Sequence, residues 1–120
     1  MIIKRAHMKT EPVERCHDGV GRLASTTAFS RPDSGPGFRF VHDNVLDPGA
    51  SIGEHLHTGD EEIYLVLEGE GTMIEDGRPY PVTAGDLCIT TAGHSHGLRN
   101  GPTPMRLLVV GVLPAPPSLP

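Results

Sequence analysis

Short hydrophobic runs, separated by turns that contain Gly or Pro, form the dominant pattern of this 120-residue chain. The runs are rich in β-branched residues or alternate apolar and polar positions, which is typical of strands. Between two of them, Asp76-Gly77 favours a tight hairpin turn, because glycine adopts positive φ without strain. The pattern predicts strands over 38–42, 51–57, 62–67, 72–75, 80–82, 86–90 and 106–110.

Little or no helix is expected, because Gly (15) and Pro (12) recur throughout and no apolar set persists at helical spacing. Short strands at this spacing favour an all-β sandwich or barrel. The length suits one domain with its own core. We expect residues 1–20 to form an N-terminal arm or edge strand, 21–113 the barrel, and 114–120 a Pro-rich tail.

The charge balance narrows the classes of partner. Ten Lys and Arg face fifteen Asp and Glu, so the net charge is −5, which argues against a nucleic-acid or anionic-membrane partner. The longest apolar run, 107–113, is far shorter than the roughly 20 residues of a membrane-spanning helix. Two cysteines are too few for a disulfide scaffold, and no secretory signal follows Met1, so a cytoplasmic location is expected.

Histidine placement carries the chemical information in this sequence. His55 and His57 lie two residues apart on an expected strand, so their imidazoles point to one face and can converge on a metal ion. A carboxylate at the start of the next strand, Glu61 or Glu62, can lie beside this pair. Farther along the chain, 94–96 reads His-Ser-His, and either histidine there can supply a fourth ligand.

The spacing of glycines around these residues is more specific than the histidines alone. Five residues separate Gly49 from His55, four separate His57 from Glu62, and six separate Glu62 from Gly69. A second set comprises Gly85, Gly93, His96 and, after three more residues, Asn100. These two sets closely resemble the two signature motifs of the cupin superfamily. The one departure is Thr91, where the family usually has proline.

The resemblance implies a small antiparallel jelly-roll β-barrel, with a metal ion bound inside one end. It implies His55, His57, Glu62 and His96 as the metal ligands. Glu62 is preferred over Glu61 because it keeps the motif spacing and the strand parity of Tyr64. Similarly, His96 is preferred over His94 because only His96 has Asn100 in the family register.

Other residues are weaker candidates for the pocket. Phe38, Phe40 and His42 share one strand face, and if that face is inward His42 is a candidate catalytic base or substrate donor. Tyr64 is a second catalytic candidate, or it fills the core with its hydroxyl satisfied. For substrate binding, Arg39 would suit a small acid, and His94 would either line the pocket mouth or lie in a solvated turn. Cys16 and His17 could form a metal pair, but we interpret them as part of an ordinary loop, and Cys88 as an inert core residue.

A site of three histidines and one glutamate suits one divalent ion, Fe, Mn, Ni, Co or Zn, since it offers no thiolate. We expect a metal-dependent enzyme acting on a small oxygen-rich molecule, of dioxygenase, decarboxylase, isomerase or lyase type. The alternative is a non-catalytic cupin that binds a sugar or carboxylate and uses the metal structurally or as a ligand anchor.

The apolar outer face of strand 62–67 needs a cover. Ile63, Leu65 and Leu67 share this face. An N-terminal strand around residues 1–5 or a second subunit would cover it, and the family resemblance favours a homodimer.

Overall fold

The computed structural model of the chain describes residues 1–31 and 35–115. Most of the expected Pro-rich tail, residues 116–120, lies outside this range.

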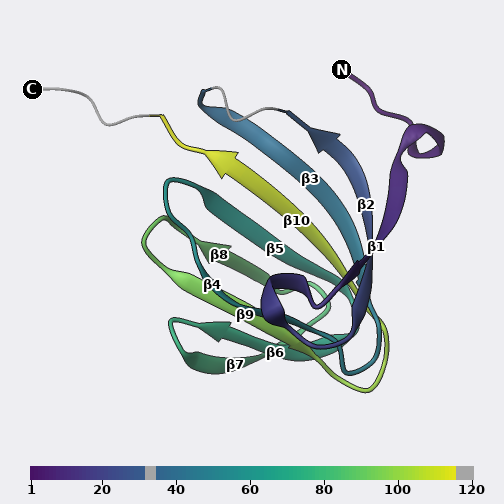
Figure 1. Cartoon of the computed structure of the whole chain (residues 1–120), viewed down its shortest axis with the longest axis vertical. Coiled ribbons are helices and arrows are strands. Elements are labelled where there is room, and N and C mark those ends of the chain that lie inside the picture. The colour runs from purple at the N-terminus through teal and green to yellow at the C-terminus, as the bar shows by residue number, and fades with distance from the viewer. Residues whose placement is uncertain (32–34, 116–120) are drawn as a thin grey trace, which may run out of the picture.

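Two antiparallel sheets make up nearly all of the described chain (Figure 1). The six-stranded sheet has the order β1-β2-β3-β10-β5-β8, and the four-stranded sheet has the order β4-β9-β6-β7. The only helical elements in residues 1–31 and 35–115 are two 3₁₀ turns, η1 (Arg5–His7) and η2 (Cys16–Asp18). The all-β prediction is therefore confirmed. The strands are β1 (Lys9–Glu14), β2 (Arg22–Ser30), β3 (Gly37–Leu46), β4 (Ser51–Leu56), β5 (Glu61–Glu68), β6 (Glu70–Glu75), β7 (Arg78–Thr83), β8 (Leu87–Thr90), β9 (Ser95–Asn100) and β10 (Met105–Leu113).

The hydrophobic core lies between the two sheets. Leu46 and Leu107 come from the six-stranded sheet, Met73 and Leu98 from the four-stranded sheet, and all four are essentially fully buried in one cluster. Side chains alternate along each strand, so every second residue of β10 enters this core. Each such side chain stabilises the fold by roughly 1.5–3 kcal/mol.

A bulge in β3 changes the expected orientation of its first residues. Phe40 pairs with Gly111, but the next partner of β10 on this strand is Phe38, so Arg39 is an extra residue in the ladder. The predicted common face of Phe38, Phe40 and His42 therefore breaks at the bulge. Phe38 is 64% exposed, while Phe40 packs against the core. Bulges re-aim side chains in this way, and here the redirected residue is Arg39.

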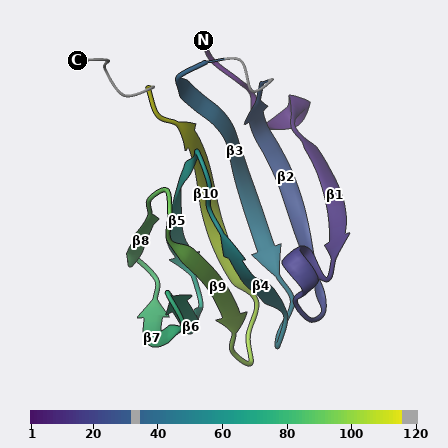
Figure 2. The same ribbon diagram turned by 60° about the vertical axis from the view of Figure 1, so that its left-hand side comes forward.

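The N-terminal segment forms the outer edge of the six-stranded sheet (Figure 2). β1 pairs antiparallel with β2, and Val13 lies opposite Leu23. After β1 the chain turns through η2 and packs against β4. There the backbone N–H of Val20 donates to Ser51 Oγ at 2.8 Å, and the N–H of Ser51 donates to the carbonyl of Val20 at 2.7 Å.

Contact between η2 and β4 is so close that one position requires glycine. A Cβ added to Gly53 would lie 1.9 Å from the carbonyl oxygen of His17. A side chain at position 53 would therefore push η2 away from β4.

The first residues of the chain do not lie against the outer face of β5. Met1 and Ile3 line an apolar surface hollow together with Phe29, Phe38 and Val41, which belong to β2 and β3. On β8, Leu87 and Ile89 are 54% and 58% exposed.

Within residues 1–31 and 35–115, no helix has the length and apolar character to cross a membrane.

Candidate metal centre

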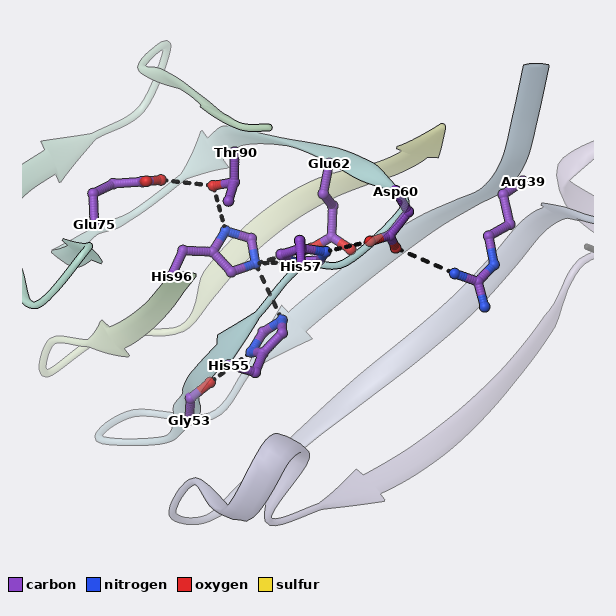
Figure 3. Close-up of polar contacts among 9 residues, drawn as sticks. All are labelled: Arg39, Gly53, His55, His57, Asp60, Glu62, Glu75, Thr90 and His96. Atoms are coloured by element: carbon purple, nitrogen blue, oxygen red, sulfur yellow. Dashed lines mark hydrogen bonds and ion pairs between the residues drawn. The ribbon is translucent and has the colours of Figure 1, made fainter. Parts of the chain in front are cut away.

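Four side chains converge at one end of the space between the sheets (Figure 3). His55 lies on β4, His57 follows its end, Glu62 lies on β5 and His96 on β9, directly opposite His55. Their ligand atoms all lie within 4.8 Å of one another. The Nε2 atom of His96 lies 2.8 Å from Nε2 of His57, 3.2 Å from Nε2 of His55 and 3.3 Å from Oε1 of Glu62.

Two of the imidazoles have their Nδ1 atoms held by groups that only accept hydrogen bonds. His55 Nδ1 lies 2.8 Å from the carbonyl oxygen of Gly53, and His57 Nδ1 lies 3.1 Å from Asp60 Oδ1. Because carbonyl and carboxylate oxygens cannot donate, both Nδ1 atoms carry the proton. In the neutral rings, the Nε2 atoms therefore present lone pairs to the centre of the site.

His96 reaches the same tautomer through a hydroxyl. Thr90 Oγ1 donates its single proton to Glu75 Oε1 at 2.7 Å, so toward His96 Nδ1, 2.8 Å away, it must accept (Figure 3). Thr90 is almost completely buried, so water does not compete for the hydrogen bonds that link Glu75, Thr90 and His96. His96 Nε2 is thereby left with a lone pair that faces Glu62.

This arrangement fits a metal ion. Three nitrogen lone pairs and a carboxylate at these short separations repel one another unless a cation lies among them. Groups that accept hydrogen bonds from the outer ring nitrogens are also the usual supports of metal-binding histidines. Imidazole and carboxylate without thiolate suit Fe, Mn, Ni, Co or Zn in the divalent state.

The protonation states of the site agree with such a role. Burial lowers the pKa of His55 to about 4, so this ring is neutral near pH 7. Burial alone would raise the pKa of Glu62, but the neighbouring His96 and His57 outweigh it and bring that pKa below its usual value, so Glu62 is a carboxylate near pH 7. Burial and the nearby Glu62 carboxylate raise the pKa of Tyr64 well above its usual value, so Tyr64 remains a hydrogen-bond donor.

The structure places the members of the two open choices, Glu61 or Glu62 and His94 or His96, in different surroundings. Glu62 is buried in the four-residue group, whereas Glu61, one position earlier on β5, has the opposite strand parity. His96 lies in the group, whereas His94 is exposed and its Nδ1 lies 2.7 Å from Asp76 Oδ2. His94 therefore lies in an exposed turn and not at the pocket mouth, since it lines neither of the two cavities beside the group.

An outer cavity of about 370 Å³ opens beside the four ligands. Arg39 lines it, and its Nη1 donates to Asp60 Oδ2 at 3.2 Å. The other oxygen of Asp60 accepts from His57, so Arg39, Asp60 and His57 form one hydrogen-bonded chain at the mouth. The remaining lining residues are His17, Phe40, His55, Leu56, Thr58 and Glu62.

A smaller cavity of about 220 Å³, which extends to the core residues Leu23 and Ile52, is also lined by Glu62. His42 lines it and stacks on Phe40 with 4.6 Å between ring centroids. Burial lowers the pKa of His42, so this imidazole is neutral near pH 7. Tyr64, whose ring centroid lies 4.4 Å from that of His96, also lines this cavity. Both expected catalytic residues thus lie next to the candidate ligands, on the inner side.

His17 was not expected at this site. Its ring stacks on His55, with 3.6 Å between the centroids and 10° between the planes, and it lines both cavities. The expectation of an ordinary loop missed this contact, because no local pattern indicates that η2 packs on β4. The turn has left-handed backbone at Arg15, His17 and Asp18, a strained conformation that persists only where the surroundings hold it.

Comparison with known proteins shows which family the chain belongs to. The family model described as Cupin domain matches residues 44–111, a range that contains all four candidate ligands. The chain belongs to the cupin family. The resemblance of the two glycine-histidine motifs is thereby confirmed, and with it the jelly-roll fold, here built as two facing sheets.

Among its relatives, this cupin is 32% identical over 114 residues to the oxalate-binding protein of Thermotoga maritima, covering 94% of both chains. It is similar to the crystal structure of a predicted oxalate decarboxylase from the same organism, with a TM-score of 0.85, 32% identity, and coverage of 94% of this cupin and 99% of that chain. It is also similar to the polyketide cyclase RemF of Streptomyces resistomycificus, with a TM-score of 0.74, 26% identity and coverage of 98% and 82%.

Proposed function

We propose that this cupin is a metal-dependent enzyme that acts on a small carboxylic acid which chelates the ion. The observation that carries the proposal is the convergence of three Nε2 lone pairs and the Glu62 carboxylate beside a polar cavity. The similarity to an oxalate-binding protein and to a predicted oxalate decarboxylase supports an acid of this class, and decarboxylation as the reaction to test first.

His55, His57, Glu62 and His96 would hold one divalent ion, Fe, Mn, Ni, Co or Zn. Bound there, the ion supplies Lewis acidity or activates dioxygen. Four protein ligands leave coordination positions for a bidentate acid on an ion that prefers six, whereas zinc prefers four in total.

The residues around the four ligands would bind the acid and handle its protons. At the mouth, the guanidinium of Arg39 attracts and orients the acid, with Asp60 fixing its position. Tyr64 keeps its proton beside Glu62, so its hydroxyl can donate to this carboxylate and keep it in place. The neutral imidazole of His42 is available to accept a proton from the substrate.

The test compares two neighbouring carboxylates. Glu62→Gln removes a ligand charge, whereas Glu61→Gln is a matched change on the other strand face. We expect Glu62→Gln to lose metal in elemental analysis and to lose metal-dependent oxalate binding in calorimetry, while Glu61→Gln keeps both. Equal oxalate binding by the metal-free wild type would contradict the proposal.

A binding protein without catalysis is the second candidate, favoured by the name of the oxalate-binding relative. His42→Ala distinguishes the two, with carbon dioxide release as the assay of turnover. Loss of turnover with retained acid affinity supports the enzyme. A wild-type protein that binds the acid tightly and releases no product supports the binder.

We also propose a homodimer formed through the outer face of the six-stranded sheet. Ile89, Ile63 and Val110 are successive cross-strand partners on β8, β5 and β10, and Leu87, Leu65 and Leu108 form a parallel row. The two rows are contiguous and apolar, and Leu87 and Ile89 within them are exposed, which is typical of an interface. A cytoplasmic location is proposed with it, on the support of the two free thiols, Cys16 and Cys88.

A further inference from the structure

The ring of His17 lies flat against one candidate ligand, yet it is not a member of the four-residue group. It stacks on His55 with 3.6 Å between the centroids, and it lines the outer cavity. Within the part of the chain that the structure describes, its ring nitrogens make no hydrogen bond and no ion pair. A hydrogen-bonding side chain thus lies one stacking distance from a candidate ligand, with its polar atoms available to a bound molecule.

Tight packing of the backbone holds this ring in place. His17 has left-handed backbone, with φ 50° and ψ 45°, a conformation that residues with side chains seldom adopt. Two glycines allow the approach to β4, because a Cβ on Gly53 would overlap the carbonyl oxygen of His17, and a Cβ on Gly19 would overlap that of Ser51. Backbone strain that the surroundings enforce is concentrated at functional sites. The enforced conformation of His17 therefore points to a role for its ring.

The chemistry of the outer cavity indicates what this role is. A chelated acid keeps outer oxygens that accept hydrogen bonds, so its site must offer donors. In the cavity lining, the carboxylates of Asp60 and Glu62 can only accept. His55 and His57 use Nδ1 on other acceptors and turn Nε2 toward the centre. The lining side chains left to donate are Arg39, Thr58 and His17.

His17 differs from the other two donors in its place. The guanidinium of Arg39 already donates to Asp60, and Thr58 lies in the turn between β4 and β5. The His17 ring instead stacks on a candidate ligand, so it lies beside whatever the ion binds on that side. An imidazole carries at least one N–H in either protonation state, so it can donate in both.

We propose that His17 is a substrate-binding residue whose ring N–H donates a hydrogen bond to an outer oxygen of the metal-bound acid. The proposal rests on the proposed function of the metal centre. It assigns recognition of the acid to His17 and leaves metal binding to the four ligands. A molecule that binds the ion without presenting an outer acceptor gains nothing from this contact.

The test compares two small molecules that bind a metal ion in different ways. Oxalate chelates through two oxygens and keeps two outer oxygens as acceptors, whereas imidazole binds through one nitrogen and presents no acceptor. Both are titrated into the cobalt-loaded protein, and the visible spectrum of cobalt reports binding. Competition with a chelator measures the affinity for cobalt itself, which a purely structural role of His17 would change.

Two variants remove the donor in different ways. His17→Phe keeps a flat ring for the stack on His55 but has no nitrogen. His17→Asn suits left-handed backbone but is too short to reach the acid. Each should weaken oxalate binding about 10- to 100-fold, the range for hydrogen bonds to charged groups, with little change for imidazole or cobalt. His7→Phe is the matched control, because His7 is exposed and lines neither cavity, and it should bind oxalate like the wild type.

The outcomes separate this contact from the proposed function. Oxalate affinities of His17→Phe and His17→Asn equal to that of His7→Phe would overturn the contact and leave the proposed function intact. Equal losses of oxalate and imidazole binding would show that the ring only supports the site, which also overturns the contact. If the wild type binds oxalate no better with cobalt than without it, the proposed function is wrong, and the contact is wrong with it.

Discussion

The hydroxyl of Thr90 determines which nitrogen of His96 faces the centre of the site. The hydroxyl has one proton, which it donates in the hydrogen bond to Glu75. Toward His96 Nδ1 it can therefore only accept, so the proton of this second bond lies on Nδ1. Gly53 and Asp60 orient the rings of His55 and His57 in the same way. Their oxygens can only accept, so they need no second residue to fix the direction of the hydrogen bond. His96 is thus the ligand whose orientation depends on a chain of two residues.

Thr90→Val should therefore weaken metal binding while leaving all four ligands in place. We expect a 10- to 100-fold loss of metal affinity, the usual range for removal of a group that orients a ligand. Competition with a coloured chelator measures it. Thr91→Val is the matched control, since Thr91 is exposed, and an equal loss in both variants would contradict the role of Thr90.

The depressed pKa of His55 predicts a pH dependence of stability in the metal-free protein. Folding lowers this pKa from 6.5 to about 4, so the unfolded chain takes up the proton first as pH falls. The contribution of His55 is fully present above pH 6.5 and is lost as pH falls toward 4. Urea unfolding in the presence of a chelator should show this loss, and His55→Asn should show a flatter profile over the same pH range.

The group of four candidate ligands could be predicted from sequence, whereas the residues that support it could not. Spacing and strand parity were enough to choose Glu62 over Glu61. Thr90 depends on facts that a sequence does not carry: it lies opposite Glu62 on β8, while Glu75 lies opposite His96 on β6. Register between distant strands is set by tertiary packing, so these partners appear only in the structure.

At the scale of elements, the contact between η2 and β4 supports the side of the metal centre. Gly53 contributes to this contact in two ways. Its carbonyl oxygen accepts a hydrogen bond from His55, and the absence of a side chain leaves room for the backbone of His17. The strained turn thereby holds the His17 ring flat against His55.

Gly53→Ala should displace η2, because the new methyl group would overlap the carbonyl oxygen of His17. Overpacking of this kind costs about 1–3 kcal/mol of unfolding free energy, which urea denaturation would measure. His17→Ala is the comparison, because it removes the stacked ring without forcing the backbones apart. An unfolding free energy of Gly53→Ala equal to that of the wild type would show that η2 is not held against β4.

Strands were predictable where large apolar residues alternate and not elsewhere. The predicted strands 62–67 and 106–110 lie within β5 and β10, and those over 51–57, 72–75 and 86–90 overlap β4, β6 and β8. β2 was missed because Ser, Thr and Ala occupy most of it, and only Leu23 and Thr26 are buried. No strand was predicted over β9, where Gly97 interrupts the apolar pattern, although a Cβ at that position would meet Glu54 of the paired strand at about 3 Å.

At the scale of the whole molecule, the outer face of the six-stranded sheet determines how copies would associate. Ile89→Arg places a charge in one of the two apolar rows and should convert the proposed dimer to a monomer at micromolar concentration, as sedimentation would show. Val20→Arg is the control, since Val20 is similarly exposed but lies between η2 and β2, outside the strands of that sheet. A wild-type protein that sediments as a monomer would contradict the dimer.

Glu62 comes from one sheet, and His55 and His96 come from the other. A bound cation would therefore act as a clasp between the two layers, and they could not separate without releasing it. Resistance to heat would then depend on how much free ion surrounds the protein, with about 1.4 kcal/mol gained for each tenfold rise above the dissociation constant. In a cell depleted of the ion, the protein would therefore lose thermal stability together with its proposed activity.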